Sequence, residues 1–392
     1  MGALRVCATE FRRIASDPGA LLILVGAVVL YAFFYPLPYV PEVLKEVPTV
    51  VVDLDGTSLS RRLARMADAH ELIRVVGRSP DLVDAENAVR RGTAGGILEI
   101  PAGFERSVLR GDSATVGLYA DAGYFLVYRQ VTTGLLEVTR TLSAGIEIRR
   151  LEASGMPPAQ ALVARDPLPV VDRPLFNPAE GYASYIVPSI LVLILQQTLL
   201  IGIGLLAGTA REQDAAPQAA GPLTVVLGRT LTYLVLYFAH AVFYFVVVYR
   251  VFGFPNRGDT ATALVFALPF LLAAILLALA VSTVFRHRET ALQVLLFTSL
   301  PAVFLAGFSW PKEMIPTWLN SISLLLPSTP AIAGFLRINQ MGASLPDVAF
   351  EWRILWCLVG LYFALAWWAQ VRSTRRFSVE ARSVFTNHGS MQ

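Results

Sequence analysis

The chain has 392 residues, of which 55% are hydrophobic and 16% are charged, and its formal net charge at pH 7 is +3. Globular chains carry about 25% charged residues, so this composition excludes an ordinary soluble protein, and the small net charge gives no sign of nucleic-acid binding. The two cysteines, Cys7 and Cys357, are too few and too widely spaced for a disulfide framework.

The N-terminal segment precedes the first apolar stretch. Residues 1–18 contain an amphipathic helix that we expect to lie at the membrane surface. Residues 19–37 form the first span, whose exit lacks the small residues of a signal-peptide cleavage site. We therefore expect an uncleaved membrane anchor.

Residues 38–180 are mostly polar and alternate between strand-like and helix-like segments, which favours a small α/β domain. A long helix is expected at about 124–151, because apolar side chains recur every three or four residues from Tyr124 to Ile146. This stripe fits packing on the domain's own sheet, and it also fits pairing with a second protomer or an outer partner. We expect strands at 49–53, 71–76, 95–100 and 115–119, and shorter helices at 58–69, 81–91 and 103–109.

A short motif in this domain needs an explanation. Val50–Thr57 reads VVVDLDGT, which matches the first motif of the haloacid-dehalogenase phosphatases, where the first Asp attacks phosphorus beside Mg²⁺. That chemistry needs a downstream lysine and an acidic pair, and no lysine follows the motif within the domain. The alternative is a strand that ends in a tight turn and a helix cap. A phosphatase that uses Asp53 and Asp55 is the corresponding alternative function.

The rest of the chain is rich in apolar segments of the roughly 20 residues that a helix needs to cross a bilayer. We predict an α-helical integral membrane protein in which a five-helix bundle at 181–371 follows the external domain, with a tail at 372–392. The six predicted spans are 20–37, 182–206, 224–248, 261–285, 291–308 and 353–371.

Polar residues inside spans often mark a transport path, and interhelical hydrogen bonding is their alternative role. No Asp, Glu or Lys lies in the middle of a predicted span, which disfavours proton or sodium coupling. The transport-path candidates are Gln196, Gln197, His240 and Gln293.

Basic residues are unevenly distributed between the two sides of the predicted membrane. Six spans place both termini on one side, and the termini and loops there hold more than twice as many basic residues as the short loops opposite. The positive-inside rule therefore predicts that both termini are cytoplasmic and that residues 38–180 are extracytoplasmic. Trp310, Trp318 and Trp352 then fit an outer interfacial belt.

Motifs for catalysis are missing from the sequence. It has no GxxxxGK[ST] phosphate loop, no Cys/His pair with metal-ligand spacing and no G-x-S-x-G elbow. We expect no catalytic residue, no metal site and no cofactor in this chain. Any transport must then draw its energy from an ion gradient or from another subunit.

Several stretches resemble the membrane subunit of type-2 ABC exporters, the ABC-2 permeases, in their drug- and efflux-type branch. The resemblance implies that Arg211 and Glu212 dock on the ATPase, although the residues after Glu212 depart from the family pattern and a plain solvated turn is the alternative. It also implies short helices in the outer leaflet at about 309–340, with the motif residues Gly307, Pro311, Pro316 and Pro327. The stretches that carry the resemblance are Pro48–Ala69, Ala210–Glu212, Arg286–Glu289, Ala306–Pro316 and Leu326–Pro330.

The resemblance implies a permease that is not itself an enzyme. Such a subunit moves an amphipathic or hydrophobic substrate (drug-like, lipid or glycoconjugate) outward across the bacterial inner membrane. Its partners are two ATPase subunits that hold ATP and Mg²⁺, a second permease subunit and membrane lipids, and a periplasmic adaptor is left open. A non-transporting receptor or scaffold is a further alternative.

Overall fold

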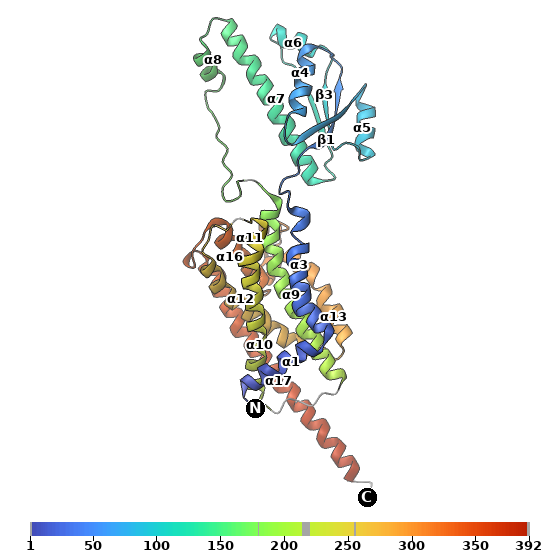
Figure 1. Ribbon diagram of the computed structural model, residues 1–392, viewed down its shortest axis with the longest axis vertical. Helices are drawn as coiled ribbons and strands as arrows, with labels where there is room; N and C mark the ends of the chain where they lie inside the picture. The colour runs from blue at the N-terminus through green and yellow to red at the C-terminus, as the bar shows by residue number, and fades with distance from the viewer. Residues whose placement is uncertain (1, 179, 214–219, 255, 390–392) are drawn as a thin grey trace. The chain divides into compact units, whose positions relative to one another are not determined.

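A computed structural model describes residues 2–178, 180–213, 220–254 and 256–389. The chain divides into two compact units, one made of Met1–Glu42 with Pro174–Gln392 and the other of Val43–Arg173. We call them the membrane unit and, after the location that the sequence predicts for it, the external unit (Figure 1).

The membrane unit is helical. Among the described residues, five helices are long and apolar enough to cross a membrane, and a bent pair of helices that meet at 84° would add a sixth. The prediction of a helical, multi-pass membrane protein is therefore confirmed. The five are Pro18–Tyr39, Tyr182–Glu212, Pro222–Phe252, Thr260–Ser282 and Pro346–Thr374, and the bent pair is Thr317–Ser323 with Ser328–Met341.

The central helix of this unit is α9, which has 78% of its most apolar window buried. It is apolar on all sides, as expected for a helix surrounded by others. The helices of the unit are α1 (Ala3–Ser16), α2 (Pro18–Leu21), π-helical η1 (Leu22–Ala27), α3 (Val28–Phe34), η2 (Leu37–Tyr39), α9 (Tyr182–Glu212), α10 (Pro222–Val242), π-helical η3 (Phe243–Val248), α11 (Tyr249–Phe252), α12 (Thr260–Ser282), α13 (Arg288–Phe297), α14 (Ser299–Leu305), η4 (Lys312–Met314), α15 (Thr317–Ser323), α16 (Ser328–Met341), η5 (Pro346–Val348) and α17 (Ala349–Gly389).

The predicted fifth span at 291–308 is not one long helix. It is divided into α13 and α14 at Thr298, and the sixth crossing candidate is instead the bent pair α15–α16. The Thr298 and Ser299 hydroxyls donate to the carbonyls of Leu295 and Leu296, which weakens the helical ladder. Pro301 follows and lacks the N–H that would continue it.

The external unit contains a four-stranded sheet in the order β2-β1-β3-β4. β1 is parallel to β2 and β3, and β4 is antiparallel to β3. Its elements are β1 (Val47–Asp53), α4 (Ser58–Asp68), β2 (Ile73–Ser79), α5 (Leu82–Arg90), β3 (Gly96–Ile100), α6 (Phe104–Arg110), β4 (Gly117–Ala120), α7 (Phe125–Ala153) and α8 (Pro158–Arg165).

Two helical layers cover this sheet (Figure 1). Successive side chains of a strand point to opposite faces, so Val51 packs in the core with α4 and α7 while Val50 and Val52 pack in the core with α5. The middle of α7 is buried against the sheet, as Leu135 shows, but Tyr124 at its start is 70% exposed. The apolar stripe of this helix thus packs mainly on its own domain.

Candidate functional site

Three segments of the membrane unit meet at one point: the α1–α2 junction, the end of α9 and the start of α13. Asp17 caps α2 by accepting the N–H of Ala20 at 3.0 Å. The same carboxylate lies 3.5 Å from the guanidinium of Arg288 and 3.4 Å from the hydroxyl of Thr209. We call this meeting point the α9 end cluster.

Arg211 and Glu212 belong to this cluster. A Glu212 carboxylate oxygen accepts the backbone N–H of Arg288 at 2.9 Å and lies 3.5 Å from a ring nitrogen of His287. Arg211 donates to the carbonyl of Phe285. Both side chains therefore hold the turn between α12 and α13, and Glu212 supplies an acceptor for one of the free N–H groups at the start of α13.

Glycines let α13 approach α9 closely. A Cβ atom at Gly208 would lie 2.6 Å from the backbone nitrogen and Cα of Arg288, and one at Gly204 would lie 2.6 Å from the Leu295 side chain. Gly204 and Gly208 form the GxxxG spacing that permits close helix contact in membranes. The sequence analysis missed this spacing, although it is visible in the sequence.

Helix α1 is held against α10 by a buried acid. Glu10 is 3% exposed; it accepts the hydroxyl proton of Tyr233 at 2.9 Å and lies 3.4 Å from Arg229. Val6, Glu10 and Ile14 are the buried residues of this helix. Their spacing of four places the acid on the apolar face, a signal that the sequence analysis did not use.

His240 and its neighbour on the same face contact the backbone of the first span. A ring nitrogen of His240 lies 3.0 Å from the carbonyl oxygen of Leu24. The hydroxyl of Tyr244 donates to the carbonyl oxygen of Val28 at 2.8 Å. Leu24 lies in the π-helical η1, and π-helical turns are frequent at functional sites. This geometry matches the interhelical hydrogen-bonding role for His240.

Gln196 forms one of two links between α9 and α16. Its side-chain oxygen accepts the backbone N–H of Ser328 at 2.7 Å, and Gln340 donates to the carbonyl of Ser184. Twelve residues separate the two contacts on each helix, so α16 is fixed to α9 at both ends. We call these contacts the α9–α16 links.

The remaining transport-path candidates do not gather at one place. Gln197 has buried side-chain nitrogen and oxygen atoms that have no hydrogen-bond partner among the described residues. Gln293 lies on an exposed face of α13. Of the four candidates, Gln196 and His240 have backbone partners and Gln197 retains unused hydrogen-bonding capacity.

The outer-leaflet motif residues mark the boundaries of short helices. Pro311, Pro316 and Pro327 immediately precede η4, α15 and α16, and proline suits the start of a helix because it lacks an N–H. Gly307 has φ +77°, and a Cβ there would meet the Lys312 side chain at 2.5 Å. The positive φ favours glycine at this position, whereas the flexible Lys312 side chain has room to move away from an added Cβ.

Asp53 of the phosphatase-like motif stabilises a turn. One of its oxygens accepts the N–H groups of Asp55 and Gly56 at 3.2 and 2.9 Å, and the other accepts the hydroxyl of Ser60 at 2.9 Å. The carboxylate that would have to attack phosphorus is thus engaged on both oxygens.

Asp55 caps a helix that begins far away in sequence. It accepts the N–H groups of Gly103 and Glu105 at 2.8 and 3.0 Å, at the start of α6, and the hydroxyl of Thr57 at 2.5 Å. Desolvation raises the pKa of Asp55, but these hydrogen bonds outweigh it and the pKa lies below the usual value of a carboxyl. Thr57, not Asp55, caps the next helix α4.

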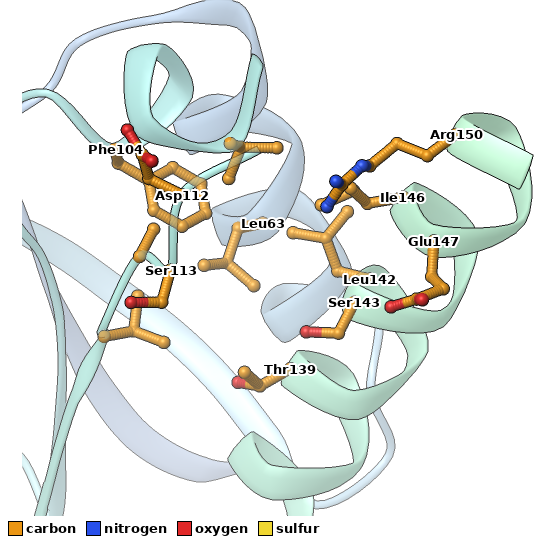
Figure 2. A pocket seen from close by; sticks show the side chains of 13 residues that line it. Leu63, Phe104, Asp112, Ser113, Thr139, Leu142, Ser143, Ile146, Glu147 and Arg150 are labelled. Atoms are coloured by element: carbon orange, nitrogen blue, oxygen red, sulfur yellow. The ribbon is translucent and has the colours of Figure 1, made fainter. Parts of the chain in front are cut away.

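The external unit also contains a cavity of about 310 Å³ between α7 and the α4–α6 side (Figure 2). Leu63 and Leu142 line its centre, and Ser143, Glu147 and Arg150 of α7 line one wall. An apolar floor with a few polar groups is typical of a site for a small amphipathic molecule.

Within the described ranges, no group of three or more His, Cys, Asp or Glu side chains is arranged to hold a metal ion. The two acids of the motif act as hydrogen-bond acceptors, and the other candidates lie in the helical bundle. The α9 end cluster and the α9–α16 links each join segments that lie far apart in the sequence.

Comparison with known proteins identifies relatives along most of the chain. A family model described as ABC-2 family transporter protein matches residues 19–368. YbhR of Escherichia coli K12, named a probable multidrug ABC transporter permease, is 22% identical over 362 residues, which cover 89% of this chain and 92% of YbhR.

Two further relatives match over shorter parts. ABC transporter G family member 20 of Dictyostelium discoideum is 22% identical over 292 residues, which are 72% of this chain and 39% of that protein. A solved domain of an ABC type-2 transporter from Thermotoga maritima MSB8 is 23% identical and covers 32% of this chain and 82% of its own, with a TM-score of 0.22. Since the family match spans most of its length, this chain belongs to the ABC-2 family of ABC transporter permeases.

Proposed function

We propose that the chain is the permease subunit of an ABC exporter that moves an amphipathic or hydrophobic substrate outward and is powered by a separate ATPase. The ATPase subunits would hold ATP and Mg²⁺, and a second permease subunit would complete the transporter. The family supports the permease role. We propose further that the protein lies in a bacterial inner membrane with both termini in the cytoplasm.

The observation that carries the proposal is the α9 end cluster. Arg211 and Glu212, proposed to couple to the ATPase, hold the α12–α13 turn, and Asp17 joins the same cluster to α1 and α2. An ATPase that pushes on the exposed side of this turn, at His287, would therefore move the ends of three segments together.

Helix α9 offers a route for that movement through the bundle. It carries the end cluster at Glu212 and the α9–α16 links at Gln196 and Ser184. Because α16 is fixed at both ends, a displacement of α9 would reach the helices at about 309–340, which we propose to lie in the outer leaflet. We propose that this linkage opens the exit and that the external unit gates it or contacts an adaptor.

A transport path beside α9 suits the proposed substrate class. The buried core of the membrane unit consists of aliphatic and aromatic side chains, and Gln197 offers buried hydrogen-bonding atoms without a partner among the described residues. A polar group on an otherwise apolar substrate would form hydrogen bonds with these Gln197 atoms, and these bonds would offset the cost of removing that group from water.

Coupling is tested with the complex purified with its ATPase. We expect Arg211→Ala with Glu212→Ala to reduce both ATPase recovery and stimulation of ATP hydrolysis by the permease, because the α12–α13 turn loses its two anchors. Arg250→Ala, at an exposed arginine of α11, is the matched control. Unchanged assembly and stimulation in the double variant would refute the proposed coupling residues.

A further inference from the structure

A second cavity lies on the membrane unit, where the break between α15 and α16 meets the start of α17. Its volume is about 500 Å³ and its polar surface is small. Its apolar lining consists of Leu324, Leu325, Phe350, Ile354 and Leu358. The Tyr362 hydroxyl donates to the carbonyl of Leu325, which fixes this break against α17.

One cation lines this apolar groove. Arg353 donates from Nε to the carbonyl of Ala349 at 3.1 Å, and its two Nη groups have no hydrogen-bond or ion-pair partner in the part of the chain that the structure describes. Glu351, the acid in the first turn of α17, is instead 3.3 Å from Arg337. A cation near a helix N-terminus is disfavoured by the helix dipole unless an anion is present.

The position of Arg353 along α17 matches a lipid headgroup. Nineteen residues separate it from Arg372, which corresponds to about 28 Å of helix, close to the roughly 30 Å of a hydrocarbon core. Trp352 and Trp356 lie in contact beside Arg353, and Arg372 lies 3.7 Å from the ring centroid of Trp368. Tryptophan and arginine at both ends are typical of the two interfaces of a span.

We propose that this groove binds one membrane phospholipid. The phosphate oxygens accept hydrogen bonds from the Nη groups of Arg353, and one acyl chain occupies the groove between Leu325 and Ile354. Arginine suits this role because its planar guanidinium binds phosphate with two parallel hydrogen bonds. The lipid would bridge the α15–α16 break and α17. This lipid site requires that α17 is inserted in a membrane, but it does not require that the protein transports a substrate.

The test is lipid titration of the delipidated full-length protein, followed by native mass spectrometry. Phosphatidylglycerol, phosphatidylethanolamine and diacylglycerol with identical acyl chains are compared, since the last lacks the phosphate. We expect the first lipid bound to be either phospholipid, with an affinity about tenfold higher than that of diacylglycerol. Arg353→Gln should remove that preference. Arg372→Gln, at the other end of the span, is the matched control.

A second readout uses the thiol that lines the groove. Cys357 is exposed and lines the cavity, and Cys7→Ser makes it the only thiol. Phosphatidylglycerol should slow its alkylation several-fold more than diacylglycerol does, and Leu325→Trp, which fills the groove, should abolish the difference. Equal binding of phospholipid and diacylglycerol, or an unchanged preference in Arg353→Gln, would overturn the proposal.

Discussion

Glu212 and Asp55 perform the same structural task in different units of the molecule. Each carboxylate accepts a backbone N–H in the first turn of a helix that begins many residues away. An acid in this position satisfies a free donor and interacts favourably with the helix dipole. Glu212 therefore holds the end of α9 against the start of α13 in one unit, and Asp55 holds the end of β1 near the start of α6 in the other.

Replacing Asp55 should destabilise the external unit. Loss of a cap typically costs about 1 kcal/mol, so Asp55→Ala should lower the unfolding midpoint of this unit in thermal or denaturant titration. Because the folded pKa of Asp55 is lowered, its contribution is complete above the unfolded value of about 3.9 and is lost as the pH falls below it. The Asp55→Ala variant should therefore lack the part of the stability that the wild type loses at low pH. If stability depended on pH in the same way in both proteins, Asp55 would not be the cap of α6.

Gly208 should not tolerate a methyl group. The added Cβ would overlap the backbone of Arg288, and overpacking of this kind costs about 1–3 kcal/mol. We expect Gly208→Ala to lower the melting temperature and to weaken ATPase stimulation. The control is Gly360→Ala, where the new Cβ would meet no atom within 4 Å apart from its chain neighbours and the nearby backbone of its own helix. Equal behaviour of the two variants would show that α9 and α13 do not pack closely at this point.

At the scale of elements, the α9–α16 links explain how a short, bent helix keeps its place. The N-terminus of α16 is fixed through Gln196 and its C-terminal part through Gln340. Neither contact follows from the local sequence of α16, because both partners lie on a helix more than a hundred residues away.

Gln196→Leu tests whether this residue supports the fold or only contacts substrate. The change leaves the buried N–H of Ser328 without an acceptor, which costs about 1–3 kcal/mol, so the melting temperature without substrate should fall. Gln293→Leu, on an exposed face, should leave it unchanged. Normal stability of Gln196→Leu with altered substrate stimulation would favour substrate contact instead.

Elements with strong local signals were predictable from the sequence. The apolar lengths of the first, second and fourth spans and the prolines before α15 and α16 are local properties, and the structure places helices accordingly. The division at Thr298 was missed because hydropathy does not register hydroxyl groups that bond to the backbone or the missing N–H of Pro301. The roles of Gln196 and His240 also depend on distant backbone atoms.

At the scale of the whole molecule, the predicted orientation depends on basic residues on one side of the membrane. It can be tested by replacing both native cysteines with serine and adding one cysteine at an exposed site. Leu109→Cys, in the external unit, should react with an impermeant maleimide in intact cells, and Leu4→Cys, in α1, should react only after lysis; the wild-type side chains are 81% and 76% exposed. The reverse pattern would invert the proposed topology.

The central claim is that this permease works with a separate ATPase. The most direct measurement is gentle purification of the full-length protein from its native membrane, followed by subunit stoichiometry and Mg²⁺-dependent ATP hydrolysis in lipid nanodiscs. We predict two permease and two ATPase subunits, with hydrolysis that depends on Glu212. A permease that purifies without a nucleotide-binding subunit, and whose purified fractions do not hydrolyse ATP, would contradict the account.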